Sequence, residues 1–147
     1  MKSGEAQMSK PEFFATPGYG ETQSENMHYS QAVRIGDRVE TSGQGGWDDG
    51  FEFPETLEEE IVRAFDNVER TLRAAGSSWA DVVHVNSYHV LGDDSFDDHN
   101  RVMVEQFRKR MGERKPIWTE SGVTALGHPK MRVEIRVTAV DQGIADD

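Results

Sequence analysis

The sequence contains no cysteine. This absence excludes disulfides, thiolate nucleophiles and cysteine-based zinc sites. No run of about 18 apolar residues is present, as a transmembrane helix would need, and the first residues lack the apolar stretch of a signal peptide. Basic residues are also few, with 16 Lys and Arg against 27 Asp and Glu, for a net charge of −11. Because such a surface repels phosphate backbones and anionic membranes, we expect a cytoplasmic protein that binds neither nucleic acid nor membranes.

Metal and cofactor motifs are absent as well. His84 and His89 lie five positions apart on a predicted strand and so face opposite sides, and the other histidines have no matched carboxylate spacing. The glycine-rich segment 43–50 fits neither a Walker loop nor a dinucleotide fingerprint. We therefore expect no metal and no cofactor, and we interpret the histidines as surface or core residues.

The length of 147 residues is that of one domain. Residues 1–26 are polar and interrupted by proline and glycine, which predicts an N-terminal arm that packs loosely or against a neighbouring molecule. Its candidate anchors are Phe13, Phe14 and Tyr19. The domain itself is predicted over residues 27–141, followed by a short tail at 142–147.

The remaining pattern predicts an α+β domain of order β-β-α-β-α-β-β. The segment from Thr56 to Glu59 is a capping box, after which apolar residues recur at helical spacing. A serine at position 95 opens a second helix in the same way. Strands are predicted at 29–35, 38–42, 82–90, 117–123 and 132–140, and helices from Leu57 to about Gly76 and from Phe96 to about Gly112. Two helices cover only one face of such a sheet, so the other face must be hidden, most simply by oligomerisation.

The C-terminal part of the sequence resembles a known family. The segments that carry the resemblance are Pro116-Ile117-Trp118-Thr119-Glu120-Ser121-Gly122-Val123, residues 131–139, Thr41-Ser42-Gly43-Gln44 and Ala64-Phe65-Asp66-Asn67-Val68. Together, and in the order in which they occur along the chain, they are similar to the RidA/YjgF family of imine and enamine deaminases, over roughly His28 to Val140. The resemblance implies a chorismate-mutase-like subunit, with a mixed sheet and two helices on one face, assembled as a homotrimer that binds a small-molecule ligand at each subunit interface.

The resemblance also implies which residues line that pocket. The matching positions are Tyr29, Ser42, Asn100 and Glu134. Each has a structural alternative: a strand tyrosine with an exposed hydroxyl, a turn serine that binds its own backbone, a helix asparagine with a structural hydrogen bond, and a glutamate paired with a neighbouring arginine.

One position departs from the family. Trp118 stands where the deaminases have an arginine that binds the substrate carboxylate. An arginine offers a two-pronged donor to a carboxylate, whereas a tryptophan offers one donor and a flat apolar face. We therefore predict weak or absent deamination of 2-iminopropanoate. Arg132 or Arg136, on the last predicted strand, is a candidate replacement for the lost anchor.

Glu120 and Glu134 are the candidate catalytic residues. Glu120 lies two residues after Trp118 and is expected on the same strand face, and Glu134 is expected on the neighbouring strand. Two carboxyl groups near an aromatic wall can exchange protons at neutral pH if burial raises the pKa of one of them. The alternative is that Glu120 is solvated and Glu134 pairs with Arg132 or Arg136.

Three functions remain open from the sequence. The first is a Rid-type hydrolase of an imine or enamine with an altered substrate, in which Trp118 stacks on a flat molecule. The alternative is a trimer that binds a small ligand without catalysis, which the loss of the arginine favours. The third, an endoribonuclease or translation inhibitor, is disfavoured by the acidic charge.

Overall fold

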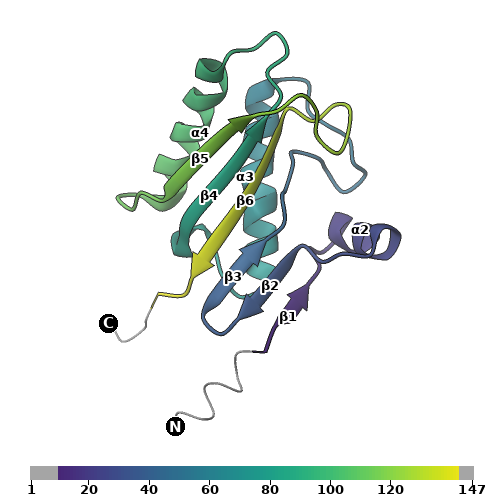
Figure 1. Ribbon diagram of the computed structural model, residues 1–147, viewed down its shortest axis with the longest axis vertical. Coiled ribbons are helices and arrows are strands. Elements are labelled where there is room, and N and C mark those ends of the chain that lie inside the picture. The colour runs from purple at the N-terminus through teal and green to yellow at the C-terminus, as the bar shows by residue number, and fades with distance from the viewer. Residues whose placement is uncertain (1–9, 143–147) are drawn as a thin grey trace.

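The computed structural model describes residues 10–142 and has the α+β architecture that the sequence predicts (Figure 1). Its six-stranded sheet has the order β1-β2-β3-β6-β4-β5, in which only β4 and β5 are parallel. The strands are β1 (Glu12–Phe14), β2 (Ala32–Ile35), β3 (Arg38–Thr41), β4 (Val82–His89), β5 (Ile117–Gly122) and β6 (Val133–Val140). The helices are α2 (Tyr19–Met27), α3 (Leu57–Ala74) and α4 (Phe96–Met111), with a 3₁₀ turn, η1 (Trp79–Asp81), before β4.

The two long helices begin where the sequence predicts. The Thr56 hydroxyl accepts a hydrogen bond from the Glu59 amide at the start of α3, over 3.1 Å. At the start of α4, Ser95 and Asp98 form a reciprocal capping box, in which each side chain accepts from the other residue's amide. Both caps satisfy amides that have no partner within the helix.

The charged side chains of α3 form ion pairs both within the helix and with other parts of the fold. Arg73 pairs with Glu69 one turn away, over 2.6 Å. Arg70 instead binds Asp49 in the preceding loop, and Asp66 binds Arg110 of α4. The helix therefore uses two of its charged side chains for contacts with other parts of the fold.

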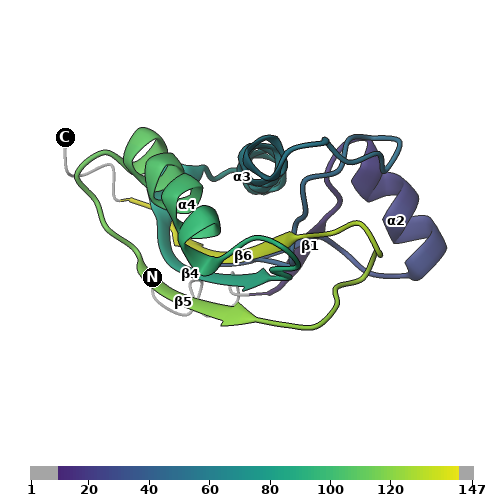
Figure 2. The ribbon, with the colours of Figure 1, turned by 90° about the horizontal axis from the view of Figure 1, so that it is seen from above.

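Strand β6 shows how the core is built. Val133, Ile135, Val137 and Ala139 alternate along it and are fully buried. They face α3 and α4, which lie together on one side of the sheet in the view from above (Figure 2). The side chains between them therefore point to the opposite face, because successive residues of a strand alternate.

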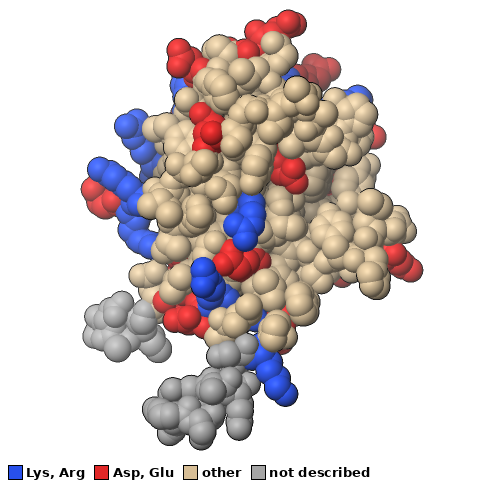
Figure 3. All heavy atoms as spheres, viewed as in Figure 1, with Lys and Arg blue, Asp and Glu red and all other residues tan. Residues whose placement is uncertain are grey.

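That opposite face has no helix over it in the described part of the chain (Figure 2). Most of the surface seen from this side belongs to uncharged residues (Figure 3). Large apolar or aromatic side chains remain exposed along the sheet, with Phe13 at 63%, Ile117 at 66% and Tyr29 at 37%. A face of this kind fits the predicted need for oligomerisation.

The loosely packed N-terminal arm is a wrong expectation for residues 10–26. β1 pairs with β2, and α2 packs against the body of the protein. Tyr19 is only 1% exposed, and its hydroxyl donates to Gln44 Oε1 over 2.5 Å. The ring packs edge-on against Trp47 in a second apolar cluster. One buried aromatic residue with a satisfied hydroxyl is enough to fix this segment. Residues 1–9 of the predicted arm lie outside the described part.

Neither membrane nor metal features appear in residues 10–142. No helix there is long and apolar enough to cross a bilayer. The same residues contain no group of three or more His, Asp or Glu side chains placed to hold a metal ion.

Candidate functional site

The six residues predicted for the site fall into two groups on opposite faces of the sheet. Trp118, Glu120 and Asn100 lie at the β5 edge, on the side covered by the helices. Tyr29, Ser42 and Glu134 belong to the uncovered face.

Trp118 is held rigidly at the β5 edge. Its indole Nε1–H donates to Ser87 Oγ of β4 over 2.9 Å. Its ring packs edge-on against Phe107 of α4, with the centroids 5.2 Å apart. The parallel pairing of β4 and β5 produces this contact, because it places Trp118 beside Val85, and Ser87 lies two residues further along β4 on the same face. The only polar atom of the indole therefore points into the protein.

Glu120 lies on the same face as Trp118, as predicted. The amide nitrogen of Asn100, from α4, donates to both carboxylate oxygens, over 3.0 Å to Oε1. Glu120 Oε2 also lies 3.3 Å from His89 Nε2. The side chain is only 18% exposed, and burial raises the pKa of the Glu120 carboxyl, partly offset by the Asn100 hydrogen bond. Glu120 is thus largely shielded from solvent, and no lysine or arginine of residues 10–142 forms an ion pair with it.

Two buried histidines stand behind Glu120. Nδ1 of His89 lies 2.8 Å from Nδ1 of His99, and Nε2 of His89 lies 2.8 Å from Ser87 Oγ. Both imidazoles are fully buried. Burial first, and then the nearby His99, lower the pKa of His89 to about 4, and burial also lowers the pKa of His99. At neutral pH, both rings are therefore uncharged.

Ser87, His89 and His99 belong to the site but were not predicted from the sequence. His84 and His89 do face opposite sides of the sheet, as predicted, but the buried partner of His89 lies on α4. A signal was available in β4, where Ser87 and His89 follow Val85 on the face that alternation assigns to the core. Buried polar side chains at two successive inward positions require partners. Single-sequence reasoning cannot supply those partners, because they come from α4 and β5.

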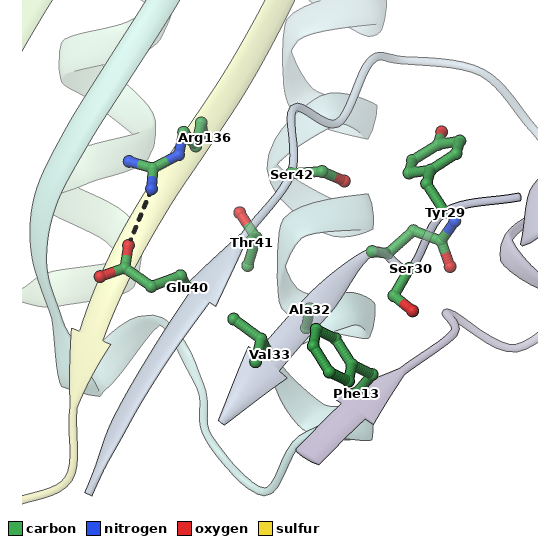
Figure 4. A pocket seen from close by; sticks show the side chains of 10 residues that line it. Phe13, Tyr29, Ser30, Ala32, Val33, Glu40, Thr41, Ser42 and Arg136 are labelled. Carbon is green, nitrogen blue, oxygen red and sulfur yellow. Dashed lines mark hydrogen bonds and ion pairs between the residues drawn. The ribbon is translucent and has the colours of Figure 1, made fainter. Parts of the chain in front are cut away.

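Tyr29 and Ser42 line one pocket on the uncovered face, about 510 Å³ in volume (Figure 4). The Tyr29 hydroxyl accepts from Gln23 Nε2 over 3.3 Å, and Ser42 Oγ accepts from Gln44 Nε2 over 3.1 Å. Arg136 of β6 also lines this pocket and pairs with Glu40 over 3.0 Å. The pocket thus combines two hydroxyl groups, an ion pair and an aromatic wall.

Glu134 is also on the uncovered face, between the buried Val133 and Ile135. Its carboxylate lies against Gly43, where any Cβ would collide with it. Burial raises the pKa of the Glu134 carboxyl. Within residues 10–142 no hydrogen bond or ion pair joins it to Arg132 or Arg136. A side chain at position 43 would therefore require the Glu134 carboxylate to move.

The predicted pair of Glu120 and Glu134 does not form within one chain, and this expectation is wrong. Strand β4 lies between β5 and β6, so the two glutamates are not on neighbouring strands. They also point to opposite faces, because Ile135 beside Glu134 is in the core while Glu120 faces α4. Both differences follow from the antiparallel pairing of β6 with β4, which keeps β6 away from β5 and sets the face on which each glutamate lies.

Arg132 is unsuited to replace the missing carboxylate anchor. Its Nε donates to Glu60 Oε1 over 2.6 Å, and its guanidinium also donates to the Pro54 carbonyl over 3.0 Å. Glu60 is fully buried, so the Arg132 guanidinium is needed to neutralise it and is not free to bind a substrate. Arg136, at the pocket of Tyr29 and Ser42, is the more accessible of the two at 38% exposure.

The two groups offer different chemistry. The edge group supplies a half-buried carboxyl with a raised pKa beside a flat aromatic surface. The face group supplies hydroxyls, an ion pair and a second carboxyl with a raised pKa. Ser42 follows β3 and Trp118 is on β5, three strand spacings away, which is about 14 Å across the sheet. One small molecule cannot contact both groups of the same chain.

Comparisons with known proteins agree with one another. The family model described as Endoribonuclease L-PSP matches residues 22–141. The chain is 38% identical to the RutC family protein YjgH of Escherichia coli over 67% of its own length and 72% of that protein. It is 35% identical to a 2-iminobutanoate/2-iminopropanoate deaminase of Dermatophagoides farinae, over 76% and 84% of the two chains. A solved structure of protein YjgH superimposes with a TM-score of 0.74 at 31% identity, over 88% and 96% of the two chains.

Proposed function

The chain belongs to the Endoribonuclease L-PSP family, which is the RidA/YjgF family, and we propose that it hydrolyses carbon–nitrogen double bonds in a small metabolite. The proposed site lies between two copies of a homotrimer, where the edge group of one copy meets the face group of the next. The similarity to a 2-iminobutanoate/2-iminopropanoate deaminase supports the reaction type. The substrate is proposed to differ, because Trp118 replaces the arginine that would bind a carboxylate.

The separation of the two groups supports a shared site. Each group alone has only part of the chemistry, and they lie on opposite faces of one sheet. The exposed apolar side chains of the uncovered face are those that an interface would bury. A second copy that covers this face would bring its β5 edge to Tyr29, Ser42 and Glu134.

The arrangement around Glu120 is the observation that carries the proposal. Asn100 and His89 hold the carboxylate, and burial raises its pKa toward the neutral range in which a general acid or base works best. In the proposed reaction, ionised Glu120 takes a proton from water as the water oxygen bonds to the imine carbon. That proton passes to the nitrogen to give a carbinolamine. Glu120 then takes the hydroxyl proton of the carbinolamine and delivers it to the nitrogen as the carbon–nitrogen bond breaks, so that ammonia and a carbonyl compound leave.

The other residues bind and orient the substrate in this proposal. Trp118 presents a flat wall, and the neighbouring copy contributes the hydroxyls of Tyr29 and Ser42. Glu134, with its raised pKa, is protonated more readily than an exposed glutamate and can donate to the substrate. Arg136 beside Tyr29 supplies the accessible cation of the face group.

Release of ammonia tests the proposal. Imines would be generated in place by an oxidase from amines and from amino acids, and their decay followed with and without the purified protein. We expect hydrolysis that Glu120→Gln lowers at least tenfold, because the amide cannot accept the proton. Glu105→Gln, at an exposed position of α4, is the matched control. No acceleration with any imine tested would overturn the enzymatic proposal.

One observation favours the second candidate, a trimer that binds a ligand without turnover. The indole N–H of Trp118 is already bound to Ser87, so it donates nothing to a substrate. This candidate predicts ligand binding without ammonia release, and the affinity would be unchanged by Glu120→Gln. Calorimetric titration of the same molecules used in the activity assay separates the two functions.

A cytoplasmic location is part of the proposal, and fractionation of cells that express the tagged protein tests it. Cleavage of RNA is not part of it, because a net charge of −11 opposes binding of a phosphate backbone.

A further inference from the structure

A continuous row of side chains connects the edge of the sheet to the interior. It runs from Glu120 Oε2 to His89 Nε2 over 3.3 Å, and from His89 Nδ1 to His99 Nδ1 over 2.8 Å. Ser87 Oγ contacts His89 Nε2 over 2.8 Å from the side. His99 Nε2, at the inner end, is buried and has no hydrogen-bond partner in residues 10–142. Three titratable groups, Glu120, His89 and His99, therefore adjoin in one row.

The number of protons in this row is fixed by the neutral imidazoles. Each ring has one N–H, because the pKa values of both histidines lie below the usual value. Only one proton can lie between the two Nδ1 atoms, since two N–H groups cannot point at each other. One ring must therefore donate at Nδ1, and the other must carry its proton on Nε2.

The charge of Glu120 decides which ring donates. When Glu120 is ionised, it can only accept, and His89 turns its N–H to Nε2. His89 Nδ1 is then an acceptor, and His99 donates from its Nδ1. When Glu120 is protonated, His89 Nε2 accepts from the Ser87 or Glu120 hydroxyl. His89 Nδ1 then carries the proton that His99 Nδ1 releases and donates to His99, while His99 takes up one proton from solvent at Nε2. The proton that leaves His89 Nε2 is the one that Glu120 gains.

We propose that His89 and His99 are positioning residues for Glu120 and act as a tautomer switch. Protonation of Glu120 exchanges the tautomers of both rings while each ring stays neutral. The balance is one added proton, which resides on Glu120, with one proton on each imidazole before and after. The inference rests on the proposed role of Glu120 in proton transfer and adds two residues that support it.

The surroundings of the row favour this exchange over protonation of a histidine. Asp94 and Asp98, near the start of α4, favour a charged His99, whereas Arg132 opposes it. Burial, which acts in the same direction as Arg132, outweighs the two aspartates and disfavours the charged form. On the β5 side, Asn100 donates to Glu120 and stabilises its ionised form. The group that gains the proton is therefore Glu120, at the more accessible end.

The exchange gives a signature that a merely structural pair of histidines would not show. Nitrogen NMR distinguishes a ring that is protonated on Nδ1 from one protonated on Nε2 or on both. The carboxyl carbon of Glu120 is followed in the same protein as pH is lowered. We expect His89 to change from mainly Nε2–H to mainly Nδ1–H, and His99 to change in the opposite sense, at the midpoint of the Glu120 transition.

Two variants complete the experiment. Glu120→Gln removes the titrating group, and we expect the tautomers of both rings to stay constant over the same pH range. His99→Phe removes the partner of His89 Nδ1, and we expect the Glu120 midpoint to move by at least half a pH unit because the coupling is lost. His84→Phe, on the uncovered face of β4, is the matched control and should leave the midpoint unchanged.

Either of two results would overturn the proposal: tautomers that do not change while Glu120 titrates, or a histidine that becomes doubly protonated in that step. The measurement uses no substrate. A protein that hydrolyses no imine can therefore still show the switch, and an active enzyme can lack it.

Discussion

Ser87 Oγ accepts a hydrogen bond from the indole Nε1–H of Trp118, over 2.9 Å. Trp118 therefore presents an apolar surface at the β5 edge, with its one donor turned inward. Ser87 also contacts His89, so the residue that fixes the aromatic wall is connected to the residues that hold Glu120. The predictions below follow from this arrangement.

An arginine at position 118 should allow the protein to bind the carboxylate of a 2-imino acid. We expect Trp118→Arg to raise hydrolysis of 2-imino acids at least tenfold relative to imines without a carboxylate, because a guanidinium donates two parallel hydrogen bonds to a carboxylate. The measurement is the ratio of kcat/KM for a matched pair of imines. Trp118→Leu, which removes the ring without adding a cation, should leave that ratio unchanged. An equal ratio in all three proteins would contradict the prediction.

Removal of the Ser87 hydroxyl should destabilise the fold. Ser87→Ala leaves the Trp118 N–H without its acceptor and removes one partner of His89, and a buried polar group without a partner costs about 1–3 kcal/mol. Urea unfolding followed by tryptophan fluorescence measures the loss. Thr124→Ala, at an exposed position after β5, serves as the control and should change the free energy of unfolding by less than about 0.5 kcal/mol.

Arg132 should stabilise the protein through Glu60. Arg132→Met leaves the fully buried Glu60 carboxylate without its cation, and we expect a loss of about 3 kcal/mol in the free energy of unfolding. Arg38→Met removes a more exposed ion pair with Glu40, in which the Arg38 side chain is 59% exposed. This substitution should lower the free energy of unfolding by less than about 1 kcal/mol. Equal effects of the two substitutions in urea unfolding would show that burial of Glu60 is not the cause.

His89 should make stability fall in acid. Its pKa is about 4 in the folded protein, below the ordinary histidine pKa of 6.5, so the unfolded chain binds more protons between these values. The stabilisation is present above pH 6.5 and is lost as pH falls toward about 4, by about 3 kcal/mol in total. The raised pKa values of Glu120 and Glu134 act in the opposite sense, because the folded protein then binds more protons than the unfolded chain just above pH 4.5.

The difference between the wild-type protein and His89→Gln isolates this contribution. We expect that difference in the free energy of unfolding to shrink as pH is lowered from about 7 to about 4. A difference that is independent of pH would contradict a depressed His89 pKa.

A site shared between copies should show complementation. Glu120→Gln and Glu134→Gln are each expected to inactivate, but mixed trimers contain interfaces at which both native glutamates meet. With random mixing in equal amounts, about a quarter of the interfaces regain both. Activity of the co-refolded mixture, compared with each variant refolded alone, is the measurement. If the mixture recovers no activity, Glu120 of one copy and Glu134 of the next do not belong to one site, and the shared-site prediction is wrong.

The local structure was predictable from sequence alone in most of the domain. Thr56 and Ser95 begin helices because their hydroxyls cap free amides, and the alternation of Val133, Ile135 and Val137 marks the buried face of β6. The same local rules failed for residues 10–26. There the fold depends on Tyr19, whose buried ring and hydroxyl find partners far along the chain.

The sequence by itself determined the family, the capped helices and the faces of the strands, because these depend on spacing within short segments. Only the tertiary structure decided which site residues meet. Strand β4 lies between β5 and β6, which separates Glu120 from Glu134 and brings Ser87 and His89 to Trp118 and Glu120. Strand order and the packing of α4 against the sheet are long-range properties, and no local pattern in this chain encodes that His99 lies 2.8 Å from His89.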